Sequence, residues 1–177
     1  IKTEPTRKRK ILKRSQMNLK ANSILLLFFV VFFSSCDDKR FFDEYIQLDN
    51  KWTKEDKVEF SFEKKDTVNL YNMFITVRNN NEYPFSNLFV IVKLNQPDNI
   101  VKIDTLQYLM ANPDGTLLGD GITDTKHNKL WYKENFKFPK SGKYTLLIEQ
   151  ANRETGKTKG VDALEGITEV GFRIEKK

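Results

Sequence analysis

The sequence predicts an all-β protein whose single domain is an antiparallel β-sandwich of about seven to eight strands. Three observations predict this fold. Apolar and polar residues alternate with the period of a half-buried strand through most of the chain. Clusters of Asn, Pro, Asp and Gly, which favour turns, separate the alternating segments. No segment carries a sustained apolar stripe of helical period, and strands that follow one another without helices favour a sandwich.

Seven segments have the alternation of a strand. They are Val58–Phe62, Val68–Arg78, Leu88–Leu94, Leu106–Met110, Leu130–Phe138, Tyr144–Ile148 and Val170–Ile174. The third of them is apolar enough to lie in the middle of a sheet. Turn signals stand between them at Asn79–Asn81, Gln96–Asn99, Asn112–Gly115, Pro139–Gly142 and Arg153–Gly156.

The segment before these strands has two interpretations. Lys39–Gln47 is the best candidate for a short helix, because Phe41, Phe42, Tyr45 and Ile46 would share one helical face. The same residues are also compatible with an extended tether.

One local motif favours an immunoglobulin-like version of the sandwich. Phe138–Leu146 resembles the corner before the sixth strand of such domains, where a Tyr hydroxyl caps the turn two residues before a core position. Here Tyr144 would be the cap and Leu146 the core residue. An ordinary hairpin with Tyr144 as one more inward aromatic explains the motif equally well, so both versions stay open.

A signal peptide precedes the domain. Ile24–Phe33 is a run of ten apolar residues, whereas a membrane-spanning helix needs about 20 and a signal-peptide core about ten. Phe33–Cys36 then resembles the lipobox of bacterial lipoproteins, where small residues admit the peptidase and the thiol accepts a diacylglyceryl group. The sequence therefore predicts lipidation of Cys36, the only cysteine. An ordinary secretory signal with an incidental thiol and an uncleaved anchor are the alternatives.

This organisation divides the chain into three parts. We expect a leader at 1–35 whose natural start is Met17, a lipidated N-terminus and tether at 36–50, and the β-sandwich at 51–177. The leader holds eight of the 30 basic and one of the 24 acidic residues, which leaves 22 basic and 23 acidic residues from Cys36 onward. The basic character belongs to the leader, so the charge gives no support for nucleic-acid binding.

The sequence predicts no enzyme. The single histidine, His127, lies in a polar loop without Cys, Asp or Glu at a metal-ligand spacing. There is no Gly-x-Ser-x-Gly motif, P-loop or dinucleotide fingerprint. Because the only thiol is assigned to lipid, we expect no catalytic residues and no cofactor.

Two features of the sequence are candidates for binding sites. In the loop Asn112–Asp124, the residues Asp114, Asp120 and Asp124 are candidates for calcium ligands, but their spacing does not match an EF-hand. Gly-containing turns in which Asp bonds the backbone explain the loop as well, so no metal is predicted. Trp131 is out of phase with Leu130 and Tyr132. It marks either a partner surface or the second face of a two-layer domain.

Several motifs together resemble one family. Asp104–Gly121, followed by Lys129–Tyr132 and Gly142–Tyr144, is similar to the GldH gliding-motility lipoproteins of Bacteroidota, and Gly166–Gly171 fits as well. The resemblance spans nearly the whole chain from Met17. It implies a palmitate- and diacylglycerol-carrying lipoprotein of the outer membrane, in bacteria whose gliding is tied to a secretion apparatus. The family has no established catalysis, and only Cys36 carries over, as the lipid attachment point.

The sequence is compatible with two functions. The first is a noncatalytic component of the gliding or secretion machinery, held at the membrane by its lipid and working through contacts with other envelope proteins. The alternative is a carbohydrate- or calcium-binding envelope lipoprotein with its site in the Asp114–Asp124 loop. Neither function involves nucleic acid.

Overall fold

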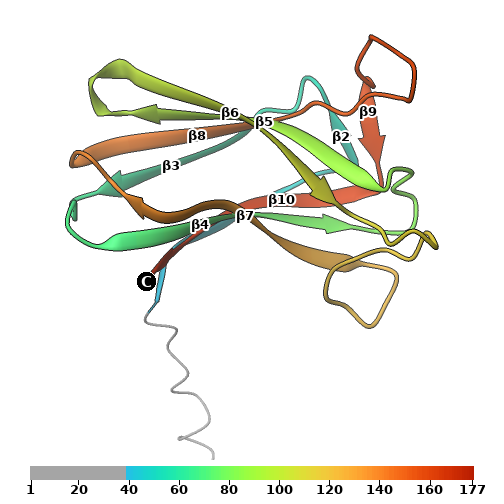
Figure 1. The fold of residues 1–177 in the computed structure, drawn as a ribbon, viewed down its shortest axis with the longest axis horizontal. Helices are drawn as coiled ribbons and strands as arrows, with labels where there is room; N and C mark the ends of the chain where they lie inside the picture. The colour runs from blue at the N-terminus through green and yellow to red at the C-terminus, as the bar shows by residue number, and fades with distance from the viewer. Residues whose placement is uncertain (1–38) are drawn as a thin grey trace, which may run out of the picture. The chain divides into compact units, whose positions relative to one another are not determined.

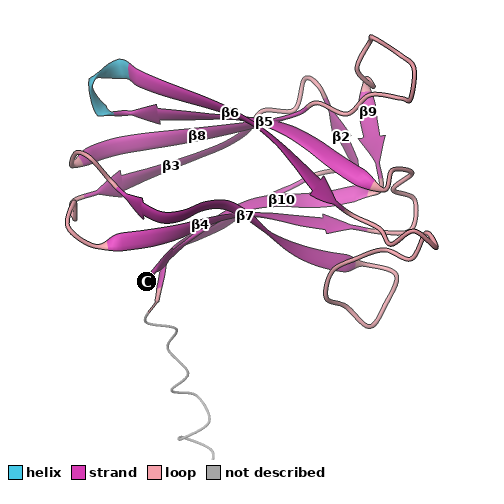
Figure 2. Ribbon diagram, in the orientation of Figure 1, coloured by secondary structure: helices cyan, strands magenta, loops and turns pink. Residues whose placement is uncertain are grey.

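The computed structural model describes residues 39–177, so the leader and Cys36 lie outside the described residues. The described chain is almost entirely strand and loop (Figure 2). Its elements are β1 (Arg40–Gln47), β2 (Lys51–Thr53), β3 (Val58–Lys64), β4 (Leu70–Asn79), β5 (Asn87–Gln96), the 3-10 turn η1 (Pro97–Asn99), β6 (Ile100–Leu109), β7 (Lys126–Lys137), β8 (Gly142–Gln150), β9 (Ala163–Glu165) and β10 (Ile167–Lys176). The prediction of an all-β antiparallel sandwich is confirmed.

Two four-stranded sheets form the sandwich (Figure 1). The β1 sheet has the strand order β1-β10-β4-β7, and the β3 sheet has the order β3-β8-β5-β6. A small third sheet pairs β2 with β9. The segment predicted to be central, β5, does lie between β8 and β6.

The strand pairs are nested like the arms of one long hairpin. β5 pairs with β6, β4 with β7, β3 with β8, β2 with β9, and β1 with β10, always antiparallel. The arms of this hairpin pass from one sheet to the other, which gives the strand order of an eight-stranded jelly roll. In the immunoglobulin sheet the first strand lies beside the second. The chain therefore adopts the jelly-roll form and not the immunoglobulin-like one.

The helical interpretation of Lys39–Gln47 is wrong, because these residues form strand β1. β1 pairs along β10, with Asp43 opposite Arg173 and Ile46 opposite Val170. Aromatic and β-branched side chains suit such a pleated surface, and pairing with a distant strand overrides the short helical pattern. β1 is not a tether either, so the folded domain begins near Arg40 and not at residue 51.

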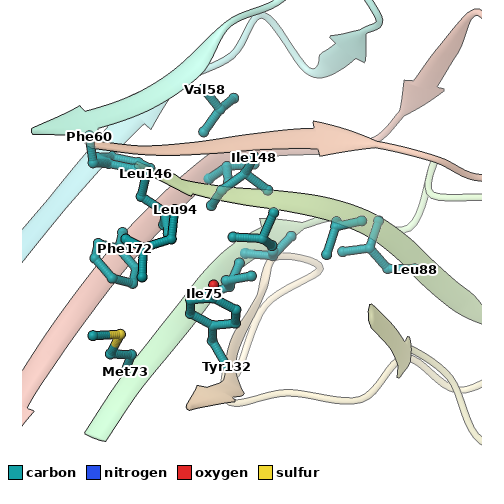
Figure 3. Packing of buried hydrophobic residues seen from close by; sticks show 14 of the residues in the cluster. Val58, Phe60, Met73, Ile75, Leu88, Leu94, Tyr132, Leu146, Ile148 and Phe172 are labelled. Atoms are coloured by element: carbon teal, nitrogen blue, oxygen red, sulfur yellow. The ribbon is translucent and has the colours of Figure 1, made fainter. Parts of the chain in front are cut away.

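The core fills the space between the two sheets (Figure 3). The inward residues of β5 are completely buried, as their alternation predicts, namely Leu88, Val90, Val92 and Leu94. An aromatic cluster packs at one end of the core around Phe62. Its ring centroid lies 5.3 Å from Phe42, 5.6 Å from Tyr144 and 5.8 Å from Phe138. Residues 39–177 thus form a compact unit that contains its own core.

The tyrosine cap predicted before β8 is present in this fold. The Tyr144 hydroxyl donates a hydrogen bond of 2.7 Å to the carbonyl oxygen of Lys140, and burial raises the pKa of this hydroxyl. Leu146, two residues later, is completely buried. The cap closes the connection between β7 and β8, which belong to different sheets. Of the two interpretations left open by the sequence, the structure thus shows the tyrosine cap, although the fold around it is a jelly roll.

Candidate contact surface

The two tryptophans have opposite environments. Trp52 is completely buried, whereas Trp131 is 53% exposed on the outer face of the β1 sheet. Strand alternation explains this position, since its neighbour Tyr132 points into the core. The sequence pattern left two interpretations of Trp131, and the structure places it on the surface.

A buried ring supports Trp131 from below. Phe74 of β4 lies opposite it in the β4–β7 register, and the two ring centroids are 4.5 Å apart at an interplanar angle of 51°. Phe74 is only 4% exposed, although it is on the outer face of its sheet. The Tyr108 hydroxyl of the other sheet donates to the Trp131 carbonyl oxygen at 2.7 Å. Trp131 is therefore held in place by its neighbours.

A row of charges runs beside this aromatic pair across the sheet. Lys129 Nζ lies 4.0 Å from the centre of the Phe74 ring and 2.7 Å from Glu175. Arg173 contacts Glu175 at 2.5 Å and Asp43 at 3.1 Å. We define the Trp131 surface by these side chains, which are Asp43, Phe74, Lys129, Trp131, Arg173 and Glu175.

Partial burial raises the pKa of Glu175, but the hydrogen bonds from Lys129 and Arg173 outweigh it, so the pKa is below its ordinary value. The carboxylate stays charged at neutral pH. The Trp131 surface thus combines an aromatic ring with fixed charges of both signs. Such a surface can bind a partner by stacking and by hydrogen bonds.

His127 lies in strand β7, so its prediction as a loop residue is wrong. Its ring centroid is 6.4 Å from that of Tyr45. Burial, and after it the nearby Arg78, lowers the pKa of His127. The imidazole is therefore neutral at pH 7 and adds no charge to the surface.

Two of the three candidate aspartates, Asp114 and Asp120, take part in the local hydrogen bonding of the Asn112–Asp124 loop. Asp114 Oδ1 accepts hydrogen bonds from the Thr116 amide at 2.9 Å and from its hydroxyl at 2.7 Å. The Asp120 amide and carbonyl pair with His127. Within residues 39–177, no group of three or more His, Cys, Asp or Glu side chains is arranged to hold a metal ion. The calcium hypothesis gains no support from this geometry.

Sequence reasoning missed the apolar outer face of the β3 sheet. Phe89, Ile91, Thr105, Ala151 and Arg153 line a hollow of about 460 Å³ there. On the neighbouring edge strand β6, Ile103 is 62% and Leu109 is 68% exposed. Phe89 and Ile91, the two apolar residues of β5 that are out of phase with its core positions, were the available signal. Both outer faces of the sandwich therefore carry exposed apolar side chains.

The described part of the chain, residues 39–177, contains no helix with the length and hydropathy that crossing a bilayer requires.

Solved structures give no guide to the function. The infectious bursal disease virus VP2 subviral particle is similar with 14% identity and a TM-score of 0.31, over 79% of this chain and 34% of that one. The chain thus spans about a third of that protein's length, and a likeness at this level carries no argument.

Curated proteins are much closer in sequence. The gliding motility lipoprotein GldH of Flavobacterium johnsoniae is 53% identical over 161 residues, which cover 91% of this chain and 99% of that protein. A GldH homolog of Christiangramia forsetii is 49% identical over 152 residues, which cover 86% and 93%. The GldH lipoprotein family matches residues 40–174, which is nearly the whole described domain. The chain belongs to the GldH lipoprotein family.

Proposed function

We propose that this protein is a lipid-anchored component of the outer membrane that is required for gliding motility and works without catalysis, through contacts with other proteins of the gliding or secretion machinery. Two relatives are named gliding motility lipoproteins, and these names support a role in gliding motility. The exposed Trp131, supported by Phe74 and flanked by paired charges, is the observation that carries the contact mechanism.

The anchor is proposed to be a diacylglyceryl group on Cys36, which becomes the N-terminus after the leader is removed. A single acyl chain of myristoyl length gives only marginal membrane binding, so stable anchoring needs more than one. A cysteine that carries two or three chains meets this requirement. The domain begins at Arg40, so the proposed anchor and the first strand are close in the sequence.

Replacing Cys36 with serine is expected to abolish acylation and to release the protein from the membrane fraction. The reason is that serine offers no thiol for thioether formation. Mass spectrometry of the protein from its native cells gives the modification, and fractionation gives the location. Wild-type protein with an unmodified Cys36, or with an intact leader, would contradict the proposed anchor.

The Trp131 surface is suited to a protein partner for a physical reason. Tryptophan is among the residues that contribute most to interfaces, and truncating such a residue typically costs about 2 kcal/mol or more of binding energy. Here the ring already has its position because Phe74 lies under it and the Tyr108 bond holds its backbone. Binding therefore loses little side-chain entropy.

Trp131→Ala is expected to weaken capture of envelope partners about 30-fold or more and to stop gliding on agar. The variant loses one aromatic pair, worth about 1 kcal/mol beyond the apolar surface that the half-exposed ring buries. This loss is smaller than that of a core ring, so the variant should stay folded. Crosslinking in gliding cells, followed by purification of the protein, measures the partners. Ile103→Ala is the matched control, since Ile103 is also more than half exposed but lies on the other sheet.

Two outcomes would count against this function. Trp131→Ala cells that glide normally, with normal amounts of the protein, would exclude the Trp131 surface as the contact. A glycan that raises the melting temperature of the wild type but not of Trp131→Ala would assign the same surface to the alternative, carbohydrate-binding function.

A further inference from the structure

The strand ends at one side of the sandwich come together where the chain enters the domain. The Lys176 amide donates to the Lys39 carbonyl oxygen at 2.7 Å, and the Lys177 amide donates to the Leu70 carbonyl oxygen at 3.0 Å. Lys137 at the end of β7 lies opposite Leu70. The start of β1 and the ends of β10 and β7 therefore share one end of the molecule, where the C-terminus is marked in Figure 1.

This end of the sandwich is rich in lysine. Five exposed lysines stand at or beside its strand ends, which are Lys39, Lys65, Lys137, Lys176 and Lys177. None of them forms an ion pair with a carboxylate of residues 39–177. We call this set the lysine end. Three acidic residues, Glu63, Asp66 and Glu134, also lie close in sequence to these strand ends. Glu175 lies opposite Arg40 but is already paired with Lys129 and Arg173. The five lysines therefore leave an excess of positive charge.

An apolar residue projects from the same end on a fixed loop. Val68, in the connection between β3 and β4, is 77% exposed. Asp66 holds this loop, because its Oδ1 accepts from the Val68 amide at 2.8 Å and its Oδ2 accepts from the Tyr71 hydroxyl at 2.6 Å. These hydrogen bonds keep the pKa of Asp66 far below its ordinary value. The loop thus presents Val68 beside Lys65.

The buried Lys64 fastens the start of β1 to this loop region. Its Nζ lies 3.8 Å from the centre of the Phe41 ring and 3.6 Å from that of Tyr71, at 2% exposure of the residue. Phe41 belongs to β1 and Tyr71 to β4. The entry point of the chain and the Val68 loop are therefore held together as one rigid unit.

We propose that the lysine end is a membrane-facing surface, where the five lysines bind the phosphate headgroups of anionic lipids and Val68 enters the interface. The orientation of the domain rests on the proposed Cys36 anchor, because four residue steps separate Cys36 from Arg40 and span at most about 14 Å. An anchor with so short a reach brings the entry end of the domain to the bilayer. The lysines then contact the lipid headgroups, and Val68 contacts the boundary between the headgroups and the acyl chains.

The expected affinity of the lysine end for an anionic membrane follows from its charges. Each lysine near an anionic surface increases affinity about fivefold, and this attraction decays within the Debye length of about 10 Å at 0.1 M salt. A protein partner for the same end would need a complementary acidic surface. No feature of the described domain points to such a partner. The short distance to the proposed anchor favours lipid.

The test uses the fragment 39–177, which forms a compact unit with its own core and carries no lipid anchor. Its cosedimentation is measured with vesicles of phosphatidylcholine mixed with phosphatidylglycerol, and with phosphatidylcholine alone. We expect binding to the anionic vesicles only, weakened by salt. The triple variant Lys65→Glu, Lys137→Glu, Lys176→Glu should bind at least about 100-fold more weakly, because it loses three attractive charges and gains three repelled ones. A control triple variant has the same change of charge at the other end of the strands. This control, Lys57→Glu, Arg153→Glu, Lys157→Glu, should bind like the wild type.

A second measurement locates the apolar contact. The fragment lacks cysteine, so Val68→Cys can be labelled with a polarity-sensitive dye. The dye emission should shift to the blue on anionic vesicles. The dye on Ile122→Cys, an even more exposed apolar site on the β6–β7 loop, should not respond.

The proposal is overturned if the fragment does not bind anionic vesicles, or if both triple variants bind them equally. It is also overturned if the triple variant of the lysine end loses an envelope protein and keeps its vesicle binding. These results leave the Cys36 anchor untouched, since mass spectrometry of the native protein decides it separately.

Discussion

Phe62→Ala is expected to lower the free energy of unfolding by about 3–5 kcal/mol. Phe62 is 6% exposed and lies at the centre of the aromatic cluster, in contact with rings from both sheets. Truncation removes its buried apolar surface and leaves a cavity that Phe42, Tyr144 and Phe138 cannot fill without breaking their own contacts. The loss is a large fraction of the stability of a typical domain, which is about 5–15 kcal/mol.

Urea denaturation of the fragment 39–177 measures this change through the midpoint of unfolding. Phe89→Ala is the control, since Phe89 is only half-buried and lies on the outer face of the β3 sheet. Its loss should be clearly smaller. A Phe62→Ala variant as stable as Phe89→Ala would show that the cluster around Phe62 does not hold the sheets together.

Gly166→Ala is expected to cost about 2–4 kcal/mol, or to prevent folding. Gly166 has a φ of +77°, and a left-handed conformation costs a side-chain-bearing residue about 1 kcal/mol or more. A Cβ at this position would also lie 2.3 Å from the Tyr83 amide nitrogen and 2.8 Å from Asn80 Oδ1. The backbone of the β4–β5 connection would have to move, and such overpacking typically adds about 1–3 kcal/mol.

Gly156 is a matched control for the backbone part of this cost. It has the same φ of +77°, but a Cβ there would meet no atom within 4 Å. Gly156→Ala should therefore show the conformational strain alone, about 1 kcal/mol. Thermal or urea unfolding of the two variants gives the difference. Equal losses would mean that the approach of Tyr83 to Gly166 has no energetic consequence.

The sequence predicts the strands of this domain well where one face is buried. All seven predicted segments overlap strands of the structure, because period-two alternation is caused directly by a buried face and a solvated face. β1 was missed since four apolar residues in nine happened to fit a helical face as well. β2 and β9 are three residues long, too short for any period to appear.

The sheet order and the surfaces depend on contacts between distant residues. Nothing local in β1 indicates that Asp43 will meet Arg173, 130 residues later. The phase of Trp131 left an exposed ring as one of two interpretations. Phe74 beneath the ring and the charge row from Lys129 to Asp43 follow only from the register. The lysine end likewise gathers side chains from β7, β10 and the segments beside β1 and β3, which are separate in the sequence.

The nesting of the strand pairs has a consequence for how the protein is made. While the chain is still leaving the ribosome or an export channel, β1 has emerged first, but its partner β10 comes last. The inner turn at η1 can pair β5 with β6 early, whereas the outermost pair must wait for the final ten residues before Lys177. Until then the aromatic residues of β1 have no sheet to cover them. A nascent chain of this kind needs a chaperone or rapid synthesis to protect its earliest segment from aggregation.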